Sequence, residues 1–178
     1  MYPAGTRHSG LRTVRDLLNS QDLDNIFGSR AARYKEQFQK IAEKEGILDS
    51  DLGDRHVHTK LWGSKTLAWN WLGFFLAYNW GAYWRLPMAW SFVGAMLTAD
   101  ILSFLLGRGQ PLVFYIGVLL IFGYYGNTWL FREVIKRAHR GDLDRYSPSL
   151  LLAFAPGILY MAGTIVWMLI LAPEQLPM

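Results

Sequence analysis

Asp100 is the residue whose position raises the first chemical question. It stands in the middle of an apolar segment, residues 87–107, that is long enough to cross a membrane. A carboxyl group at that depth costs at least about 2.5 to 3.5 kcal/mol unless it is paired, hydrated or neutral. Asp100 therefore indicates either a proton or ion path, or a carboxyl group that is hydrogen-bonded to neighbouring hydroxyls.

Hydroxyl groups are expected at the same depth on the next two apolar segments. Antiparallel packing places Tyr115 or Val118 on the second segment, and Tyr160 to Thr164 on the third, beside Asp100. We predict that Tyr115, Tyr160 and Thr164 satisfy the carboxyl group. No second carboxylate, Lys or Arg lies at this depth, which argues against a pump or an ion-coupled transporter working alone.

Asn127 is the second polar residue within an apolar segment. It lies roughly 15 Å from Asp100 along the membrane normal, at 1.5 Å of rise per residue, so the two cannot pair. An Asn is tolerated near the end of a span when another segment satisfies its amide. We expect Asn127 to bond to Asn70 or to a nearby Trp indole.

Carboxylates and imidazoles gather before the first apolar segment, at Asp49, Asp51, Asp54, His56 and His58. A strand-like stretch would put both His rings on one face, which makes them a weak candidate for a metal site. The spacing matches no standard zinc or calcium loop, so a solvated acidic linker is the favoured interpretation. We predict no metal and no other cofactor.

The chain shows no motif of a known catalytic site. It has no Cys, and it lacks the patterns of the serine hydrolases, the P-loop proteins and the zinc metalloproteases. The sequence therefore predicts a protein that is not an enzyme.

The composition shows what must hold these polar residues. The 178 residues are 52% hydrophobic and 15% aromatic but only 18% charged, against roughly 25% charged in average soluble domains. Eleven of the 18 Lys and Arg residues precede residue 67. The high apolar fraction disfavours a disordered chain, the net charge of only +4 disfavours a nucleic-acid-binding domain, and the absence of Cys disfavours a disulfide scaffold.

Three segments meet the length of about 20 apolar residues that a membrane span requires. They are residues 87–107, 111–131 and 149–172. Residues 132–148 form a basic loop between the second and third, and the positive-inside rule makes this loop cytoplasmic. The tail, residues 173–178, is then external. The basic residues of the loop that we single out are Arg132, Lys136, Arg137 and Arg140.

The aromatic segment, residues 67–86, is the ambiguous one. Its side chains are of the kind that anchors at headgroup depth: Trp69, Asn70, Trp71, Trp80, Trp84 and Arg85. If the segment crossed the membrane, the basic N-terminal arm would have to be translocated. We therefore predict an interfacial or shallow re-entrant helix; the alternative is a fourth span with an external N-terminus.

The arm, residues 1–66, is predicted to be helical, amphipathic and cytoplasmic. No signal-peptide core follows Arg7 and His8. Thr13 or Asp16 can open a short helix that Gly28 stops, and Ser29 can cap a second helix that ends at Gly46. The narrow apolar stripe of the second helix cannot bury a core alone, so it must lie on the membrane domain, a headgroup surface or another protein.

Two stretches resemble a family of small bacterial inner-membrane proteins known as domain of unknown function 2628. The first contains Trp69-Asn70-Trp71, Phe74-Phe75, Trp80, Tyr83 and Arg85. The second contains Gly126-Asn127, Trp129, Arg132, Val134 and Ile135. The resemblance covers about residues 69–137 and implies a location in the bacterial inner membrane, not an activity.

These observations together predict an all-α membrane protein with a cytoplasmic N-terminus and an external C-terminus. Its expected role is that of a non-catalytic accessory or scaffold subunit of a larger membrane complex. The bilayer and other membrane proteins are its expected partners, reached through small-residue helix faces and the arm. A small channel or transporter component that uses Asp100 is the first alternative. A lipid sensor at the membrane surface is the second.

Overall fold

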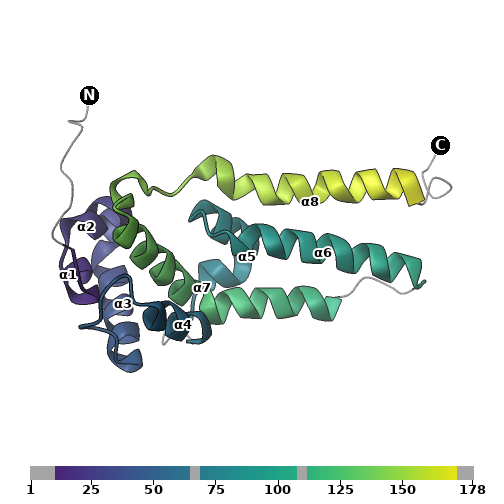
Figure 1. The fold of residues 1–178 in the computed structure, drawn as a ribbon. Helices are drawn as coiled ribbons and strands as arrows, with labels where there is room; N and C mark the ends of the chain where they lie inside the picture. The colour runs from purple at the N-terminus through teal and green to yellow at the C-terminus, as the bar shows by residue number, and fades with distance from the viewer. Residues whose placement is uncertain (1–10, 65–68, 108–111, 172–178) are drawn as a thin grey trace. The chain divides into compact units, whose positions relative to one another are not determined.

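The described residues, 11–64, 69–107 and 112–171 of a computed structural model, fold into helices without any strand (Figure 1). They form two compact units. The first, which we call the charged unit, is built from Met1–Asn70 and Tyr124–Pro148; the second, the apolar unit, is built from Trp71–Gly123 and Ser149–Met178. The long helix α7, Leu112–Arg140, contributes to both.

The charged unit begins with two short helices where the sequence predicted one. They are α1, Val14–Leu18, and α2, Gln21–Phe27. Thr13 caps α1 as expected, in a reciprocal capping box with Asp16. The chain breaks at Ser20, whose hydroxyl bonds to the carbonyl of Leu17 at 2.8 Å. A Ser side chain competes with the helical backbone for hydrogen bonds, and the apolar pattern alone does not reveal this.

The next helix, α3, spans Ala31–Glu45 and ends where the sequence predicted. Gly46 adopts a left-handed conformation with φ of 63°, a conformation that is costly for other residues. Lys40 pairs with Glu36 at 2.5 Å. The predicted cap at Ser29 is wrong, because Ser29 lies inside the 3₁₀ turn Gly28–Arg30 that leads directly into the helix.

The apolar stripe of α3 is buried within the chain itself. Phe38 is fully buried and stacks on Phe131 of α7 with ring centroids 4.5 Å apart. Tyr34 and Phe27 extend this aromatic core. The arm therefore does not leave its stripe open for a partner, because the second half of α7 completes its hydrophobic core.

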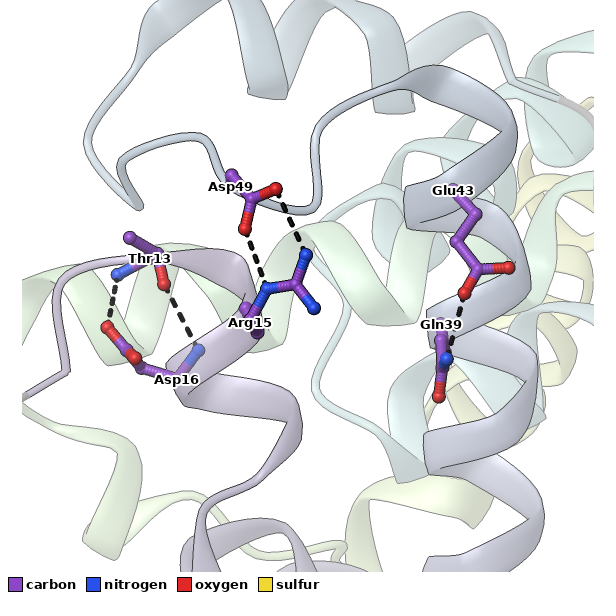
Figure 2. Close-up of polar contacts among 6 residues, drawn as sticks. All are labelled: Thr13, Arg15, Asp16, Gln39, Glu43 and Asp49. Carbon is purple, nitrogen blue, oxygen red and sulfur yellow. Dashed lines mark hydrogen bonds and ion pairs between the residues drawn. The ribbon is translucent and has the colours of Figure 1, made fainter.

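The acidic segment after α3 has a defined backbone, and its carboxylates Asp49, Asp51 and Asp54 are exposed to solvent. Its backbone runs beside the start of α1, with hydrogen bonds from Val14 to Ser50 and from Leu52 to Arg12. Arg15 forms a two-pronged ion pair with Asp49, at 2.6 and 3.0 Å. Figure 2 shows this pair beside the Thr13 cap and the Gln39 to Glu43 hydrogen bond of α3.

Helix α4, Arg55–Gly63, follows the acidic segment. Asp54 caps it by accepting a hydrogen bond from the backbone N–H of His56 at 2.8 Å. The strand-like conformation considered for residues 56–58 is therefore wrong. Two residues on a helix differ in direction by about 200°, so His56 and His58 do not share a face.

The apolar unit confirms the three predicted membrane-spanning helices. Within the described residues, three helices are long and apolar enough to cross a membrane. They are α6, Met88–Leu105; α7, Leu112–Arg140; and α8, Leu150–Leu171. The chain is thus a membrane protein by the length and composition of its helices.

Helix α7 does not end where the predicted loop begins. Residues 132–140, expected to be loop, continue the same helix, and only Gly141, with φ of 72°, stops it. Charged residues end a membrane span without ending a helix, because Arg, Glu and Lys are good helix formers. The 3₁₀ turn Leu143–Arg145 follows.

The aromatic segment forms α5, Trp71–Tyr83, a helix of 13 residues. Ala77 interrupts it with φ of 38° and ψ of −114°, which an L-residue adopts only at some cost. Thirteen residues extend about 20 Å, less than a hydrocarbon core of about 30 Å. This kinked helix packs on α6 and α8.

Two of the tryptophans predicted as headgroup anchors belong to the protein interior. Trp80 is 3% exposed and Trp84 is 5% exposed, whereas Trp71 is 61% exposed. Composition predicts an aromatic belt, but it cannot tell which indoles face outward. Trp80 and Trp84 therefore contribute to the packing of the apolar unit.

Candidate functional site

Asp100 is buried on α6, and hydroxyls from two other helices hold its carboxyl group. Tyr115 of α7 donates to Oδ1, and Tyr160 of α8 donates to Oδ2. The two tyrosine hydroxyl oxygens lie 2.6 Å from each other. One residue from each of the three spans thus meets in a closed polar cluster, which we call the Asp100 cluster.

The lengths of the helices explain why these residues meet. Asp100 lies five residues before the end of α6, at Leu105, and Tyr115 lies three residues after the start of α7, at Leu112. In two consecutive antiparallel helices, residues at similar distances from the connecting turn lie at similar depth. The contacts predicted from Tyr115 and Tyr160 to Asp100 are confirmed.

Thr164 is not part of the Asp100 cluster. Its hydroxyl donates to the backbone carbonyl of Tyr160, one turn earlier on α8, at 2.9 Å. A Thr hydroxyl within a helix can always reach the backbone carbonyl one turn earlier. It therefore needs no hydrogen-bond partner on another helix. The expectation that Thr164 bonds to Asp100 is wrong.

The chemistry open to the Asp100 cluster is limited. Each carboxyl oxygen already accepts a tyrosine hydroxyl. Asp100 is also the only carboxylate between residues 67 and 130 of the sequence. A proton relay needs a succession of exchangeable groups across the membrane, which this single cluster does not supply. The arrangement is suited to tie three helices together.

A second buried polar contact lies in the charged unit. The side-chain amide of Asn70 donates to Oδ1 of Asn127 at 3.0 Å, and both residues are buried. This confirms the contact that we predicted from Asn127 to Asn70. The contact joins the segment that enters α5 to the middle of α7, and it is separate from the Asp100 cluster.

The other residues of the predicted anchor have different environments. Trp69 meets Tyr124 edge to face at 4.7 Å, and Trp71 stacks on Phe75 at 5.8 Å. Arg85 is exposed and takes a left-handed conformation, with φ of 53°, at the turn between α5 and α6. A Gly usually occupies such a position.

The four basic residues of the predicted loop lie on α7 and differ in their partners. Arg137 turns inward, where it pairs with Glu133 at 3.0 Å and with Asp142 at 3.4 Å. Its guanidinium carbon also lies 4.6 Å from the ring centre of Tyr146. Arg137 is therefore a structural residue. Lys136 is partly exposed and Arg140 is exposed.

Arg132 has an unusual environment for a basic residue. Its Nε donates to the carbonyl of His58 at 3.2 Å, and its guanidinium carbon lies 4.9 Å from the ring centre of Trp62 on α4. Trp62 in turn lies 6.1 Å from Trp129. Arg132 is thus held in place by aromatic and backbone contacts rather than by a carboxylate.

The pKa of His58 is lowered below its ordinary value. Partial burial is the main cause, and the positive charge of Arg132 is the second, with smaller contributions from His139 and Lys136. Arg132, His139 and Lys136 therefore lie near enough to His58 for their positive charges to disfavour its protonated form. The described residues contain no group of three metal-ligating side chains.

The sequence did not single out Trp62 or His139 as site residues, and it pointed to Trp129 only through the family resemblance. The ring of His139 lies against Gly53, where a methyl group would come within 2.5 Å of its Cε1 atom. Arg132, Lys136 and His139 have the spacing i, i+4 and i+7, which places them on one helix face. That signal becomes readable only when residues 132–140 are recognised as helix.

Comparison with known protein families, with curated proteins and with solved structures finds no match for this chain. The class that the fold defines is an all-helical membrane protein with three candidate spans. The resemblance to domain of unknown function 2628 stays a prediction.

Proposed function

We propose that this chain is a non-catalytic accessory or scaffold subunit of a larger complex in the bacterial inner membrane. In this proposal the charged unit lies on the cytoplasmic side. The C-terminal end of α8 lies on the external side, and α5 is an interfacial or re-entrant helix. The bacterial origin rests on the family resemblance, and the orientation rests on the positive-inside rule.

The observation that carries this proposal is the Asp100 cluster. Its carboxyl group is buried, and both of its oxygens accept hydrogen bonds from tyrosines of neighbouring spans. Interhelical hydrogen bonds of this kind contribute roughly 0.6 to 2 kcal/mol each in a membrane. A polar group used in this way supports a structural role more than a transport path.

The outward surfaces of the spans support a role in assembly. Large apolar side chains are exposed along one face of α8, among them Leu151, Phe154, Ile158 and Ile165. A methyl group added at Gly94 of α6 or at Gly117 of α7 would meet no atom within 4 Å. Small residues on an open helix face allow another helix to approach closely.

The proposal is tested by purifying the tagged full chain from its own membranes in a mild detergent. We expect a companion membrane protein to co-purify at a constant stoichiometry through two different columns. Isolation of the chain as a lone monomer would overturn the proposal. Phe154→Trp on the outer face of α8 should weaken the association, whereas Arg30→Gln, in the 3₁₀ turn before α3, is a control that leaves it unchanged.

The channel alternative predicts a different response to Asp100→Asn. An amide keeps the shape of the carboxyl group and accepts a tyrosine hydroxyl, but it cannot exchange a proton. If the chain scaffolds a complex, the complex should form at nearly its normal yield in this variant. A complete loss of function with normal assembly would favour the channel component instead.

A further inference from the structure

The charged unit carries a second cluster that the scaffold function does not use. We call it the basic aromatic cluster. It consists of His58 and Trp62 of α4, and of Trp129, Arg132, Lys136 and His139 of α7. All six residues belong to the charged unit.

Positive charge gathers in this cluster without a neutralising partner. The charges of Arg132, His139 and Lys136 all act on His58. Among the described residues, no carboxylate forms an ion pair with Arg132 or Lys136. The two carboxylates at this end of α7 pair with Arg137 instead. The acidic residues that lie near the cluster in the sequence have other partners: Glu133 pairs with Arg137, and Asp54 accepts the backbone N–H of His56 at the start of α4. Uncompensated cations held close together favour an anionic ligand.

The aromatic half of the cluster has the character of a membrane interface. Tyr125 stacks on Trp129 at 5.7 Å, and Trp129 lies 6.1 Å from Trp62. Trp62 is 53% exposed although it is a large apolar residue. Tryptophan and tyrosine beside arginine are typical of the headgroup depth, where one end of the ring is apolar and the other is wet.

The position along α7 agrees with this depth. The rise from Leu112 to Arg132 is about 30 Å at 1.5 Å per residue, which equals the thickness of the hydrocarbon core. Arg132 is therefore the first charged residue that α7 presents beyond the apolar part of the bilayer. Lys136 and His139 follow on the same face, one and two turns further.

We propose that the basic aromatic cluster binds the headgroup phosphate of an anionic phospholipid, with Arg132 and Lys136 as the main ligands. Trp62 holds the guanidinium of Arg132 from one side and inserts its exposed edge among the lipid chains. His58 and His139 add charge when they are protonated. The inference does not depend on the scaffold function, because a lone monomer with this site would still bind the lipid.

The test uses the full chain in a neutral detergent and follows its thermal unfolding. A short-chain phosphatidylglycerol, the matching phosphatidylcholine and inorganic phosphate are titrated separately. A ligand that binds only the folded state raises the midpoint, by an amount that grows with the logarithm of its concentration divided by its Kd. We expect phosphatidylglycerol to bind about tenfold or more tightly than the other two, which corresponds to the charge of a few basic residues near a membrane surface.

Variants locate the site. Arg132→Gln with Lys136→Gln should weaken phosphatidylglycerol binding roughly 25-fold, about fivefold for each cation. Arg30→Gln with Arg33→Gln removes the same charge from exposed positions of the same unit and should change the affinity less than about twofold. If the first pair does not fold, Lys136→Gln alone gives the fivefold test, because its side chain makes no ion pair with the described residues.

Three results would overturn the inference. Equal binding of phosphatidylcholine means that the lipid chains alone are recognised. Equal binding of inorganic phosphate means that the cluster takes a free anion instead of a lipid. An equal loss in the Arg30 and Arg33 control means that only the net charge of the protein matters.

Discussion

The charged unit and the apolar unit of this chain are stabilised in different ways. The charged unit has an interior like that of a water-soluble domain, in which Phe38 and Phe131 stack face to face and are fully buried. The three spans leave most of their large apolar side chains exposed. They are joined instead by a buried carboxyl group and two tyrosines.

This difference follows from the solvent around each unit. In water, burial of apolar area drives folding, at about 25 cal/mol per Å². In a bilayer the lipid tails are as apolar as leucine, so burying apolar side chains between helices gains little. Polar contacts and close packing between helices must therefore supply more of the stability. The stability of the two units should therefore respond differently to the same kind of substitution.

The largest effect is expected in the core of the charged unit. Phe38→Ala should destabilise it by about 3 to 5 kcal/mol, because a fully buried aromatic ring leaves a cavity. The protein is unfolded with urea in detergent, and the susceptibility of the arm to proteolysis reports the fraction that is unfolded. Phe154→Ala on α8, where the side chain is 66% exposed, is the matched control and should change stability little. An equal response of both variants would remove the contrast between the units.

The Asp100 cluster gives the second effect. Tyr115→Phe with Tyr160→Phe leaves a buried carboxyl group without its donors, at a cost of about 1 to 3 kcal/mol. Adding Asp100→Leu to this pair removes the unsatisfied group and should recover most of the loss. Unfolding of the detergent-solubilised protein by sodium dodecyl sulfate measures both variants. No recovery in the triple variant would contradict the structural role of the cluster.

The Asn70 to Asn127 contact should contribute less. Asn127→Leu removes one amide hydrogen bond in the charged unit and should cost about 1 kcal/mol. The double variant with Asn70→Leu should be closer to wild type than the sum of the single changes, because the two side chains are in contact. Unchanged stability in Asn127→Leu would show that this contact is incidental.

The smallest effect is a pH dependence from His58. Its pKa is lowered in the folded chain, mainly by partial burial and by Arg132, so the unfolded chain binds the proton more readily. The stability is then fully present above the ordinary pKa of about 6.5 and declines as the pH falls from there toward the lowered pKa. His58→Gln should flatten the decline in thermal midpoint between pH 7.5 and 5.5.

The control for this pH dependence is His56→Gln, on the same helix at an exposed position. Added phosphatidylglycerol should also flatten the decline in wild type, because an anion beside His58 favours its protonated form. A decline that is identical in the His58 variant would contradict the role of this residue.

Much of the architecture was accessible from the sequence because charge and length are strong signals. The three spans, the end of α3 at Gly46, and the partners of Asp100 and Asn127 follow from residue types and helical rise. The start of α3 and the break at Ser20 could not be predicted in this way, because local hydrogen bonds determine where these helices begin and end. The positions of Trp80 and Trp84 were also hidden, because composition does not tell which face of a helix is buried.

The basic aromatic cluster was hidden for a related reason. Arg132 and Lys136 were visible as charge, but the sequence placed them in a loop and left them without a common face. The continuation of α7 to Arg140 aligns them with His139, and the fold of the arm brings α4 and Trp62 beside them. Tertiary contacts between residues about 70 positions apart cannot be read from a local pattern.

The proposed orientation puts the N-terminal arm of the charged unit on one side of the membrane and the C-terminal end of α6 on the other. The chain has no Cys, so single cysteines at the exposed positions Arg30 and Leu106 can be labelled cleanly. A membrane-impermeant maleimide is applied to bacterial cells with an intact inner membrane. We predict that Leu106→Cys is labelled at once and that Arg30→Cys is labelled only after permeabilisation. Labelling of Arg30→Cys in intact cells would contradict the account and support a fourth span.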